Sequence, residues 1–144
     1  MKIHFVCSGN TYRSRLAEAY LNSLKHKGIG AVSSGAHAKT QPMEIRWYTE
    51  RILEEYGLSR FTSKVHRQTT ASNLKDSDLI VFFGPSVYGF CKKNFPMKKP
   101  CVIWDILDLH PRQSEPKVVK LTEGAFKEIK NKVKELISGL KKSK

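Results

Sequence analysis

The chain has 144 residues, 40% of them hydrophobic and 27% charged, a composition typical of one soluble globular domain. Its 26 basic and 13 acidic residues leave a net charge of +13, which favours anionic partners such as phosphate esters, acidic protein surfaces or nucleic acid. Three widely spaced cysteines argue against a disulfide framework or a zinc site, and no segment resembles a signal peptide or a membrane span, so we expect a cytoplasmic protein.

Apolar, β-branched runs alternate with helical periodicities along the chain. In chain order we expect a strand over residues 2–6, a helix over 14–27 that ends at Gly28, a strand over 31–33, a helix over 42–56, a strand over 79–83, a helix over 86–94, a strand over 100–104 and a helix over 115–140. Strands separated by helices predict the α/β class. We expect one doubly wound domain over residues 1–144, with a four-stranded parallel sheet, helices on both faces and a short basic tail at about 141–144.

The last predicted helix carries much of the positive charge. From Lys117 to the end there are nine lysines and three glutamates. We interpret the lysines mainly as the solvated face of an amphipathic helix, whose core stripe consists of Leu121, Phe126, Ile129, Val133, Leu136 and Leu140. No nucleic-acid motif or aromatic-basic repeat accompanies this charge, so we do not expect nucleic acid as a partner.

Residues that could take part in binding or catalysis directly follow the predicted strands. Cys7, Ser34, Gly84, Asp105 and Asp108 all stand at or just beyond the carboxyl end of a strand. In parallel sheets ligands bind beyond these ends, at the point where the strand order reverses. These residues are therefore expected to converge on one site.

The loop after the first strand is the most informative segment. It joins a strand to a helix in six residues, Ser8, Gly9, Asn10, Thr11, Tyr12 and Arg13, and this tight turn should gather backbone N–H groups at a helix N-terminus. Such a nest binds anions, and an arginine fork adds two donors suited to phosphate oxygens. The same positive field favours the thiolate of Cys7, so the pattern C-x5-R-S predicts a phosphate site with a nucleophile.

The chain resembles the low-molecular-weight protein tyrosine phosphatases, whose fold the thioredoxin-coupled arsenate reductases share. The likeness covers nearly the whole length and is carried by five segments: V-C-S-G-N-T-Y-R-S at residues 6–14 with A-E-A at 17–19, V-S-S-G-A at 32–36, G-L at 57–58, D-S-D-L-I-V at 76–81 and W-D-I-L-D at 104–108.

The resemblance implies a two-step phosphate transfer without a metal or another cofactor. Cys7 would attack phosphorus to form a cysteinyl-phosphate, while Arg13 and the amides of residues 8–13 hold the phosphate oxygens. Ser14 matches the serine that hydrogen-bonds the thiolate. Asn10 matches the asparagine that fixes the loop, and Ser34 is expected to be its hydroxyl partner. His66 is either a supporting histidine or a structural one.

An aspartic acid would protonate the leaving oxygen and then activate water. Aligned on Trp104, Asp108 matches the aspartate of the family's D-P motif, although Leu109 stands in place of the proline. Asp105 is the other candidate for this proton donor. Alternatively, Asp105 is only a loop or cap residue beside the strand end.

Three departures from the family pattern bear on the substrate. Tyr12 replaces a second loop cysteine, so no protective disulfide can form with Cys7. Arg15 replaces a proline and is expected to add positive potential at the pocket. Leu109, His110 and Pro111 stand where relatives carry tyrosines, and Tyr12, Trp47 or Tyr48 could form the aromatic wall instead.

We therefore predict a cysteine-dependent phosphatase acting on phosphotyrosine, in a protein or a small aryl ester, with inorganic phosphate as product. One alternative is an arsenate reductase. Its disulfide relay would need Cys91, in a helix, and Cys101, which is expected to be buried in the fourth strand. The other alternative is an anion-binding module without catalysis.

Overall fold

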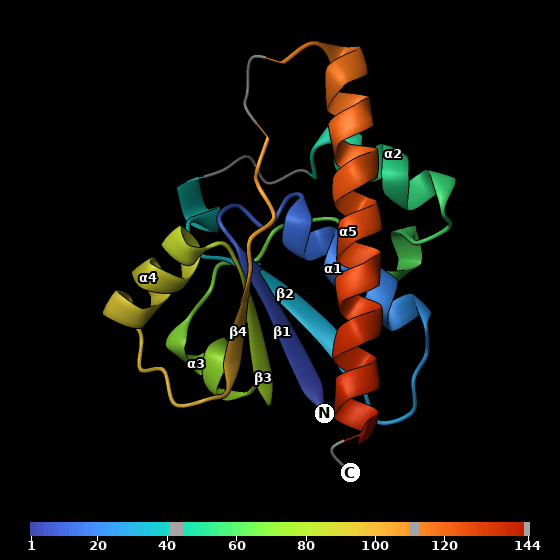
Figure 1. Cartoon of the computed structure of the whole chain (residues 1–144). Coiled ribbons are helices and arrows are strands. Elements are labelled where there is room, and N and C mark those ends of the chain that lie inside the picture. Colours follow the sequence, from blue (N-terminus) through green and yellow to red (C-terminus); the bar gives the residue numbers. More distant parts are fainter. Residues whose placement is uncertain (41–44, 110–112, 143–144) are drawn as a thin grey trace.

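A four-stranded parallel sheet forms the centre of the fold in a computed structural model that describes residues 1–40, 45–109 and 113–142 (Figure 1). The strands are β1 (Lys2–Cys7), β2 (Gly30–Gly35), β3 (Leu79–Phe83) and β4 (Cys101–Trp104), in the order β2-β1-β3-β4. Each neighbouring pair is parallel, so all the carboxyl ends lie at one edge. This confirms the predicted α/β class and the four-stranded parallel sheet.

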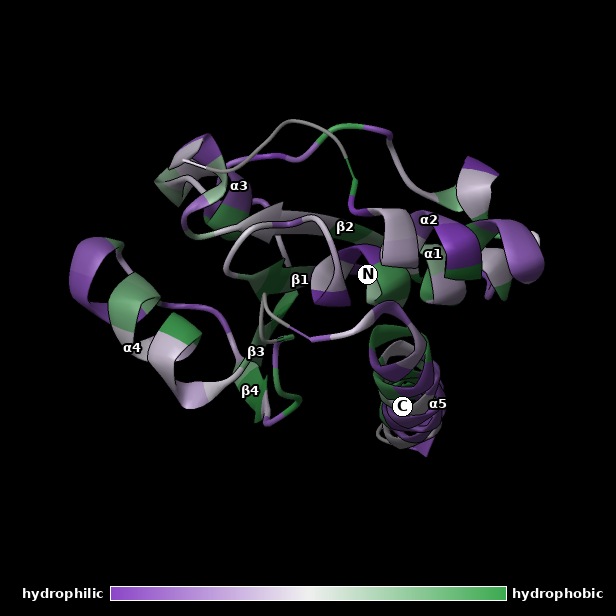
Figure 2. Ribbon diagram, turned by 90° about the horizontal axis from the view of Figure 1, so that it is seen from above, coloured by the Kyte–Doolittle hydropathy of each residue, from purple (hydrophilic) through white to green (hydrophobic). Residues whose placement is uncertain are grey.

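Helices cover both faces of the sheet, as the sequence predicts. They are α1 (Arg13–Ser23), α2 (Trp47–Glu55), α3 (Ala71–Lys75), α4 (Pro85–Asn94) and α5 (Glu115–Lys142), with 3-10 turns η1 (Ala38–Thr40) and η2 (Ser59–Phe61). Figure 2 shows α3 and α4 on one side of the strands and α1 and α5 on the other.

Side chains of β1 alternate between two separate apolar cores, because successive residues of a strand point to opposite faces. Ile3 and Phe5 pack into the core on the side of α1 and α5, where they are fully buried. Val6 packs into the smaller core on the side of α3 and α4. Every residue of β3 is buried, which explains its continuous apolar sequence LIVFF.

The strand order places a reversal point beside β1. From β1 the chain crosses to β2 on one side and later to β3 on the other. The loop after β1 therefore emerges between two crossover connections that diverge, which is the usual ligand position in a doubly wound sheet. The predicted site at the carboxyl ends of the strands lies at this point.

Several predicted bounds differ from the structure. The first helix ends at Ser23 rather than Lys27, because Lys25 adopts a left-handed φ of 50° and turns the chain before Gly28. The second helix begins at Trp47, and residues 42–44 of its predicted range lie outside the described residues. The short helix α3, which a capping box of Thr70 and Asn73 begins, was not predicted, since five residues carry too little periodicity.

The long helix α5 buries a slightly different stripe from the predicted one. Leu121 was expected in the core but is 40% exposed. The buried positions are Val118, Thr122, Phe126, Ile129, Val133 and Ile137. Thr122 is therefore buried in this turn of the helix instead of Leu121. Within the described residues, no helix combines the length and apolar character that crossing a bilayer requires.

Candidate active site

A cleft of about 850 Å³ opens where the loop after β1 meets the start of α2 and the segment that leads into α5. Its lining residues are Cys7, Ser8, Gly9, Thr11, Tyr12, Arg13, Arg46, Trp47, Tyr48, Asp108, Leu109, Gln113, Glu115 and Val118. Both ends of the predicted phosphate loop, Cys7 and Arg13, therefore line the same cavity.

Cys7 is the last residue of β1 and is only 2% exposed. Its Sγ lies 2.9 Å from Ser14 Oγ and accepts a hydrogen bond of 3.2 Å from the backbone N–H of Asn10. The Ser14 hydroxyl and the Asn10 amide therefore both contact this sulfur. The structure thus places Ser14 where the sequence comparison expects it.

Asn10 connects the loop to three neighbouring segments. It has a left-handed φ of 59°, a conformation that asparagine tolerates better than most residues. Its Nδ2 donates to Ser14 Oγ at 2.8 Å and to Ser33 Oγ at 2.9 Å. Its Oδ1 accepts a hydrogen bond of 2.8 Å from the backbone N–H of Arg67.

The expected partnership between Asn10 and Ser34 is wrong, and Ser33 takes that place. Because strand residues alternate between faces, Ser33 and Ser34 point to opposite sides of the sheet. Ser34 Oγ lies 2.7 Å from His4 Nε2 and 2.6 Å from Thr69 Oγ1. It therefore belongs to a buried polar chain on the far side of the sheet.

Arg13 begins α1 and is held from behind by the sheet. Its Nη1 donates to the carbonyl oxygens of Phe83, at 3.0 Å, and Ile106, at 2.8 Å. Its Nη2 lies 3.5 Å from Asp108 Oδ2. The two carbonyls fix the plane of the guanidinium, and Arg13 lines the cleft.

The two candidate acids occupy different places. Asp108 lines the cleft that contains Cys7, and its side chain is 55% exposed. Asp105 lines an adjoining hollow of about 400 Å³ and is not among the residues that line the Cys7 cleft. Arg13 and Asp108 border both cavities. Asp108, and not Asp105, therefore shares a cleft with Cys7.

Residues 2–144 match the family described as low molecular weight phosphotyrosine protein phosphatase. The chain belongs to this family. The match spans the loop, the sheet and the final helix, in agreement with the resemblance in the sequence. A comparison with curated proteins finds no match.

Solved structures of phosphatases and of an arsenate reductase share the fold. The low molecular weight protein tyrosine phosphatase from T. tengcongensis is 21% identical, with a TM-score of 0.82 over 96% of this chain and 99% of that chain. The YwlE arginine phosphatase from Geobacillus stearothermophilus is 19% identical, with a TM-score of 0.77 over 99% and 94%. An arsenate reductase from Archaeoglobus fulgidus is 28% identical, with a TM-score of 0.68 over 91% and 98%. Structural neighbours of this phosphatase family therefore differ in what they act on.

Three aromatic residues line the cleft of this family member. The rings of Tyr12 and Tyr48 meet edge to face at 5.2 Å, and Trp47 meets Tyr48 in the same manner at 5.6 Å. Burial, followed by the negative charge of Asp108, raises the pKa of Tyr12 and of Tyr48. Both phenols are neutral at pH 7, as ordinary tyrosines are, and Tyr12 is only 3% exposed. Leu109 also lines the cleft, whereas His110 and Pro111 lie outside the described residues.

Arg15, where the phosphatase family has a proline, does not line the pocket, although its charge interacts electrostatically with Cys7. Its side chain is fully buried behind the loop, and it is absent from the residues that line the cleft. Its Nε donates to the carbonyl oxygen of Asn10 at 2.9 Å. The sequence comparison marked this position as unusual but could not give the direction of the side chain.

Gly35 is a further residue of the site whose role sequence reasoning missed. A Cβ at this position would lie 2.7 Å from backbone atoms of Ser8, Gly9 and Asn10. The loop can pack this closely on β2 only because residue 35 has no side chain. This glycine belongs to the segment V-S-S-G-A, which resembles the family, but the spacing of residues alone does not show that two backbones are in contact.

His66 lies half-buried in the segment that follows η2. The next residue, Arg67, makes the backbone contact to Asn10. A supporting role for His66 itself stays a prediction.

The other two cysteines lie away from the cleft. Cys91 is fully buried in α4, and burial raises the pKa of its thiol to about 11. Cys101 begins β4 and is exposed, so the expectation that it is buried is wrong. It stands at the opposite end of its strand from the site. In the described part of the chain, no group of three or more His, Cys, Asp or Glu side chains could hold a metal ion.

Proposed function

We propose that this chain is a cysteine-dependent phosphatase that hydrolyses phosphotyrosine, in a protein or a small aryl ester. The observation that carries the proposal is that Cys7, Arg13 and Asp108 line one cleft. A nucleophile, an anion-binding guanidinium and a proton donor are the three groups that cleavage of a phosphate ester by this route requires.

In the first step, the Cys7 thiolate attacks phosphorus, so that an S–P bond forms while the P–O bond to the leaving group breaks. Arg13 and the amides of residues 8–13 hold the three other phosphate oxygens and stabilise the charge of the transition state. Asp108, protonated at this stage, delivers its proton to the leaving oxygen, which departs as a neutral alcohol or phenol.

In the second step, Asp108 accepts a proton from water as the water oxygen attacks phosphorus. The S–P bond breaks, inorganic phosphate forms, and the thiolate of Cys7 is restored. Ser14 and the amide of Asn10, which contact Sγ, make the thiolate a better leaving group in this step.

The aromatic lining supports a phenyl leaving group. Trp47 and Tyr48 border the cleft beside the loop, and Trp47, at 47% exposed, is accessible to a substrate ring, whereas Tyr12 is only 3% exposed. Aromatic pairs in edge-to-face or offset contact add about 0.5–1.5 kcal/mol beyond the area they bury.

An arsenate reductase is less well supported. That activity, as the family resemblance describes it, passes the disulfide through two further cysteines. Cys91 packs in the core on the side of α3 and α4, and Cys101 lies at the far end of β4. Neither lines the cleft that contains Cys7.

The decisive experiment compares wild-type protein with Cys7→Ser on p-nitrophenyl phosphate and on peptides that carry phosphotyrosine, phosphoserine or phosphoarginine. We expect fastest turnover of the aryl esters, and loss of turnover in Cys7→Ser with retention of phosphate binding. Unchanged turnover in Cys7→Ser would contradict the mechanism. Phosphate binding without turnover in the wild type would instead indicate an anion-binding module, and thioredoxin-dependent arsenate turnover would indicate the reductase.

A further inference from the structure

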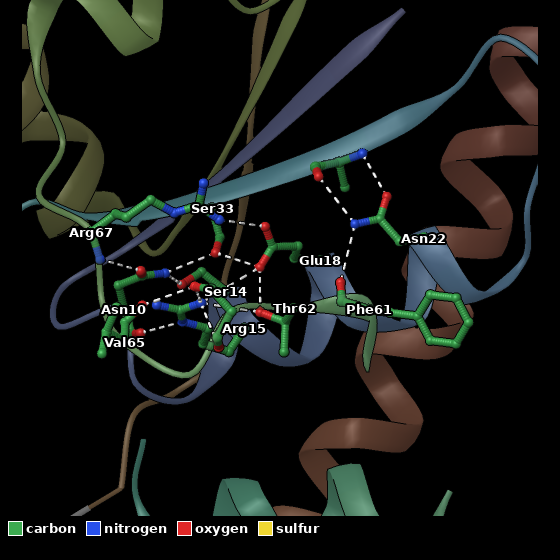
Figure 3. A network of polar contacts seen from close by, with 12 residues as sticks. Asn10, Ser14, Arg15, Glu18, Asn22, Ser33, Phe61, Thr62, Val65 and Arg67 are labelled. Atoms are coloured by element: carbon green, nitrogen blue, oxygen red, sulfur yellow. Dashed lines mark hydrogen bonds and ion pairs between the residues drawn. The ribbon is translucent and has the colours of Figure 1, made fainter. Parts of the chain in front are cut away.

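A largely buried ionic network surrounds Asn10 of the phosphate loop (Figure 3). We call it the Arg15 network, and its members are Asn10, Arg15, Glu18, Ser33, Thr62, Ser63 and Arg67. Arg15 is fully buried and Glu18 is 3% exposed. None of its charged side chains lines the cleft. The proposed mechanism does not use this network.

Arg15 bridges the loop and the segment after η2. Its Nε donates to the carbonyl oxygen of Asn10 at 2.9 Å. Its Nη1 donates to Thr62 Oγ1 at 3.1 Å, to the carbonyl oxygen of Ser63 at 3.0 Å, and to Ser63 Oγ. One planar guanidinium thus joins two segments that are about fifty residues apart in the chain, which the single ammonium of a lysine could not do with the same geometry.

Glu18 completes the network from the next turn of α1. Its Oε1 lies 3.8 Å from Arg15 Nη1 and accepts hydrogen bonds from Ser33 Oγ, at 3.0 Å, and from the hydroxyl of Thr62. Its Oε2 lies 2.9 Å from Arg67 Nη2. A buried carboxylate with this many donors is held in one orientation and compensates the buried charge of Arg15.

Three members of the network contact Asn10, the residue of the loop with a left-handed φ. Arg15 holds its carbonyl oxygen, the backbone of Arg67 holds its Oδ1, and Ser33, itself bonded to Glu18, accepts from its Nδ2. The backbone N–H of the same residue donates to Cys7 Sγ. The conformation that directs an amide at the sulfur is therefore fixed from behind.

We propose that Arg15 is a positioning residue, which together with Glu18 holds Asn10 and the loop amides in the geometry that binds a phosphate oxyanion. The inference rests on the proposed function. It assigns a role in positioning the loop to Arg15, at a position where the family has proline. Because preorganised donors bind an anion without first having to be ordered, loosening the network weakens both phosphate binding and stabilisation of the transition state.

The test uses three variants of the full chain. Arg15→Met removes the charge and the hydrogen bonds but keeps an unbranched side chain, and Arg15→Lys restores the charge with fewer bonds. Arg60→Met is the matched control, because Arg60 is an exposed arginine on the neighbouring turn η2 and lies outside the network. Binding of inorganic phosphate is measured by calorimetry, and kcat and KM are measured with p-nitrophenyl phosphate.

In Arg15→Met we expect the Kd for phosphate to rise about tenfold or more and kcat to fall by at least as much, since small displacements of a binding group are costly. Arg15→Lys should recover part of both, and Arg60→Met should match the wild type within about twofold. A folded Arg15→Met protein with unchanged phosphate affinity and kcat would overturn the proposal, as would an equal loss in Arg60→Met.

Two further measurements keep the test decisive. If Arg15→Met does not fold, Glu18→Gln, which keeps the side-chain shape, should also weaken phosphate binding, and unchanged binding would overturn the proposal. Calorimetry needs no turnover, so a wild-type chain that binds phosphate but cleaves no ester would refute the proposed function and still test Arg15. A wild-type chain that binds no phosphate would overturn both.

Discussion

Single side chains in this site act through the backbone of the loop. Asn10 has contacts on three sides, to Ser14 of α1, Ser33 of β2 and the backbone of Arg67, and it also directs its own N–H at Cys7. A left-handed residue costs of the order of 1 kcal/mol or more, so it persists where the surroundings determine it strongly. The reactivity proposed for Cys7 therefore involves Asn10, whose N–H contacts the sulfur.

The choice between Asp108 and Asp105 leads to a prediction about leaving groups. Asp108→Ala should lower kcat by about 10²-fold or more for alkyl and phenyl phosphates, because these leaving groups need a proton in the transition state. For p-nitrophenyl phosphate, whose leaving group is stable as an anion, the loss should be much smaller. Steady-state kinetics over a series of esters measure this difference. Asp105→Ala is the control, and the same pattern in that variant would reverse the assignment.

Gly35 gives a second prediction with a control in the same strand. In Gly35→Ala the new Cβ would lie 2.7 Å from backbone atoms of Ser8, Gly9 and Asn10, so the loop must move. We expect phosphate affinity and kcat each to fall about tenfold or more, because a loop displaced by a fraction of an ångström no longer fits the oxyanion.

Gly30→Ala is the matched control for this change. Gly30 begins the same strand, and a Cβ there would meet no atom within 4 Å. This variant should retain wild-type affinity and turnover. Equal behaviour of the two alanine variants in calorimetry and kinetics would argue against the close contact between β2 and the loop.

At the level of elements, the long helix α5 has one buried face and one exposed face. The helix α5 packs along α1 and α2 through its buried stripe. Its exposed positions carry most of the lysines that follow Lys117. This arrangement agrees with the interpretation of those lysines as a solvated face.

The buried stripe of α5 predicts unequal costs for two similar substitutions. Ile129 is fully buried, and Ile129→Ala should lower the free energy of unfolding by about 2–5 kcal/mol through lost burial and a cavity. Leu121 is 40% exposed, so Leu121→Ala should cost well under about 1 kcal/mol. Urea unfolding at pH 7 compares the two. Equal costs would mean that α5 is rotated relative to the structure described here.

For the molecule as a whole, the buried polar chain on the far side of the sheet makes stability depend on pH. His4 is 1% exposed, and its ring contacts Ser34 Oγ on one side and Ser77 Oγ on the other. Burial lowers the pKa of His4 from an ordinary 6.5 to about 4. The unfolded chain therefore takes up this proton more readily than the folded chain between these values.

The free energy of unfolding should accordingly fall as the pH drops from about 6.5 to about 4, by up to roughly 3 kcal/mol from this residue. Urea unfolding at pH 7 and at pH 4.5 would show the decrease. His4→Gln should lower the stability at pH 7 but make it less sensitive to pH, whereas His26→Gln should leave the pH dependence as in the wild type. A His4→Gln protein with the wild-type pH dependence would contradict this.

Some parts of the site could be predicted from the sequence, and others could not. The placement of Cys7 and Arg13 follows from local order, since a short connection from a strand to a helix keeps its two ends close together and gathers backbone N–H groups between them. The choice of Ser33 over Ser34 could not be predicted, because a shift of one residue changes the face of the strand. The inward direction of Arg15 was equally hidden, because its partners Thr62 and Ser63 are distant in the chain.

The sequence by itself determined the α/β class, the strands, the phosphate loop and the family, because these depend on periodicity and on spacing between near neighbours. Only the tertiary structure decided which aspartate lines the cleft with Cys7, why residue 35 is glycine, and that Arg15 supports the loop from behind. Each of these depends on contacts between segments brought together by the packing of α1, β2 and the segment after η2, and no local pattern records such contacts.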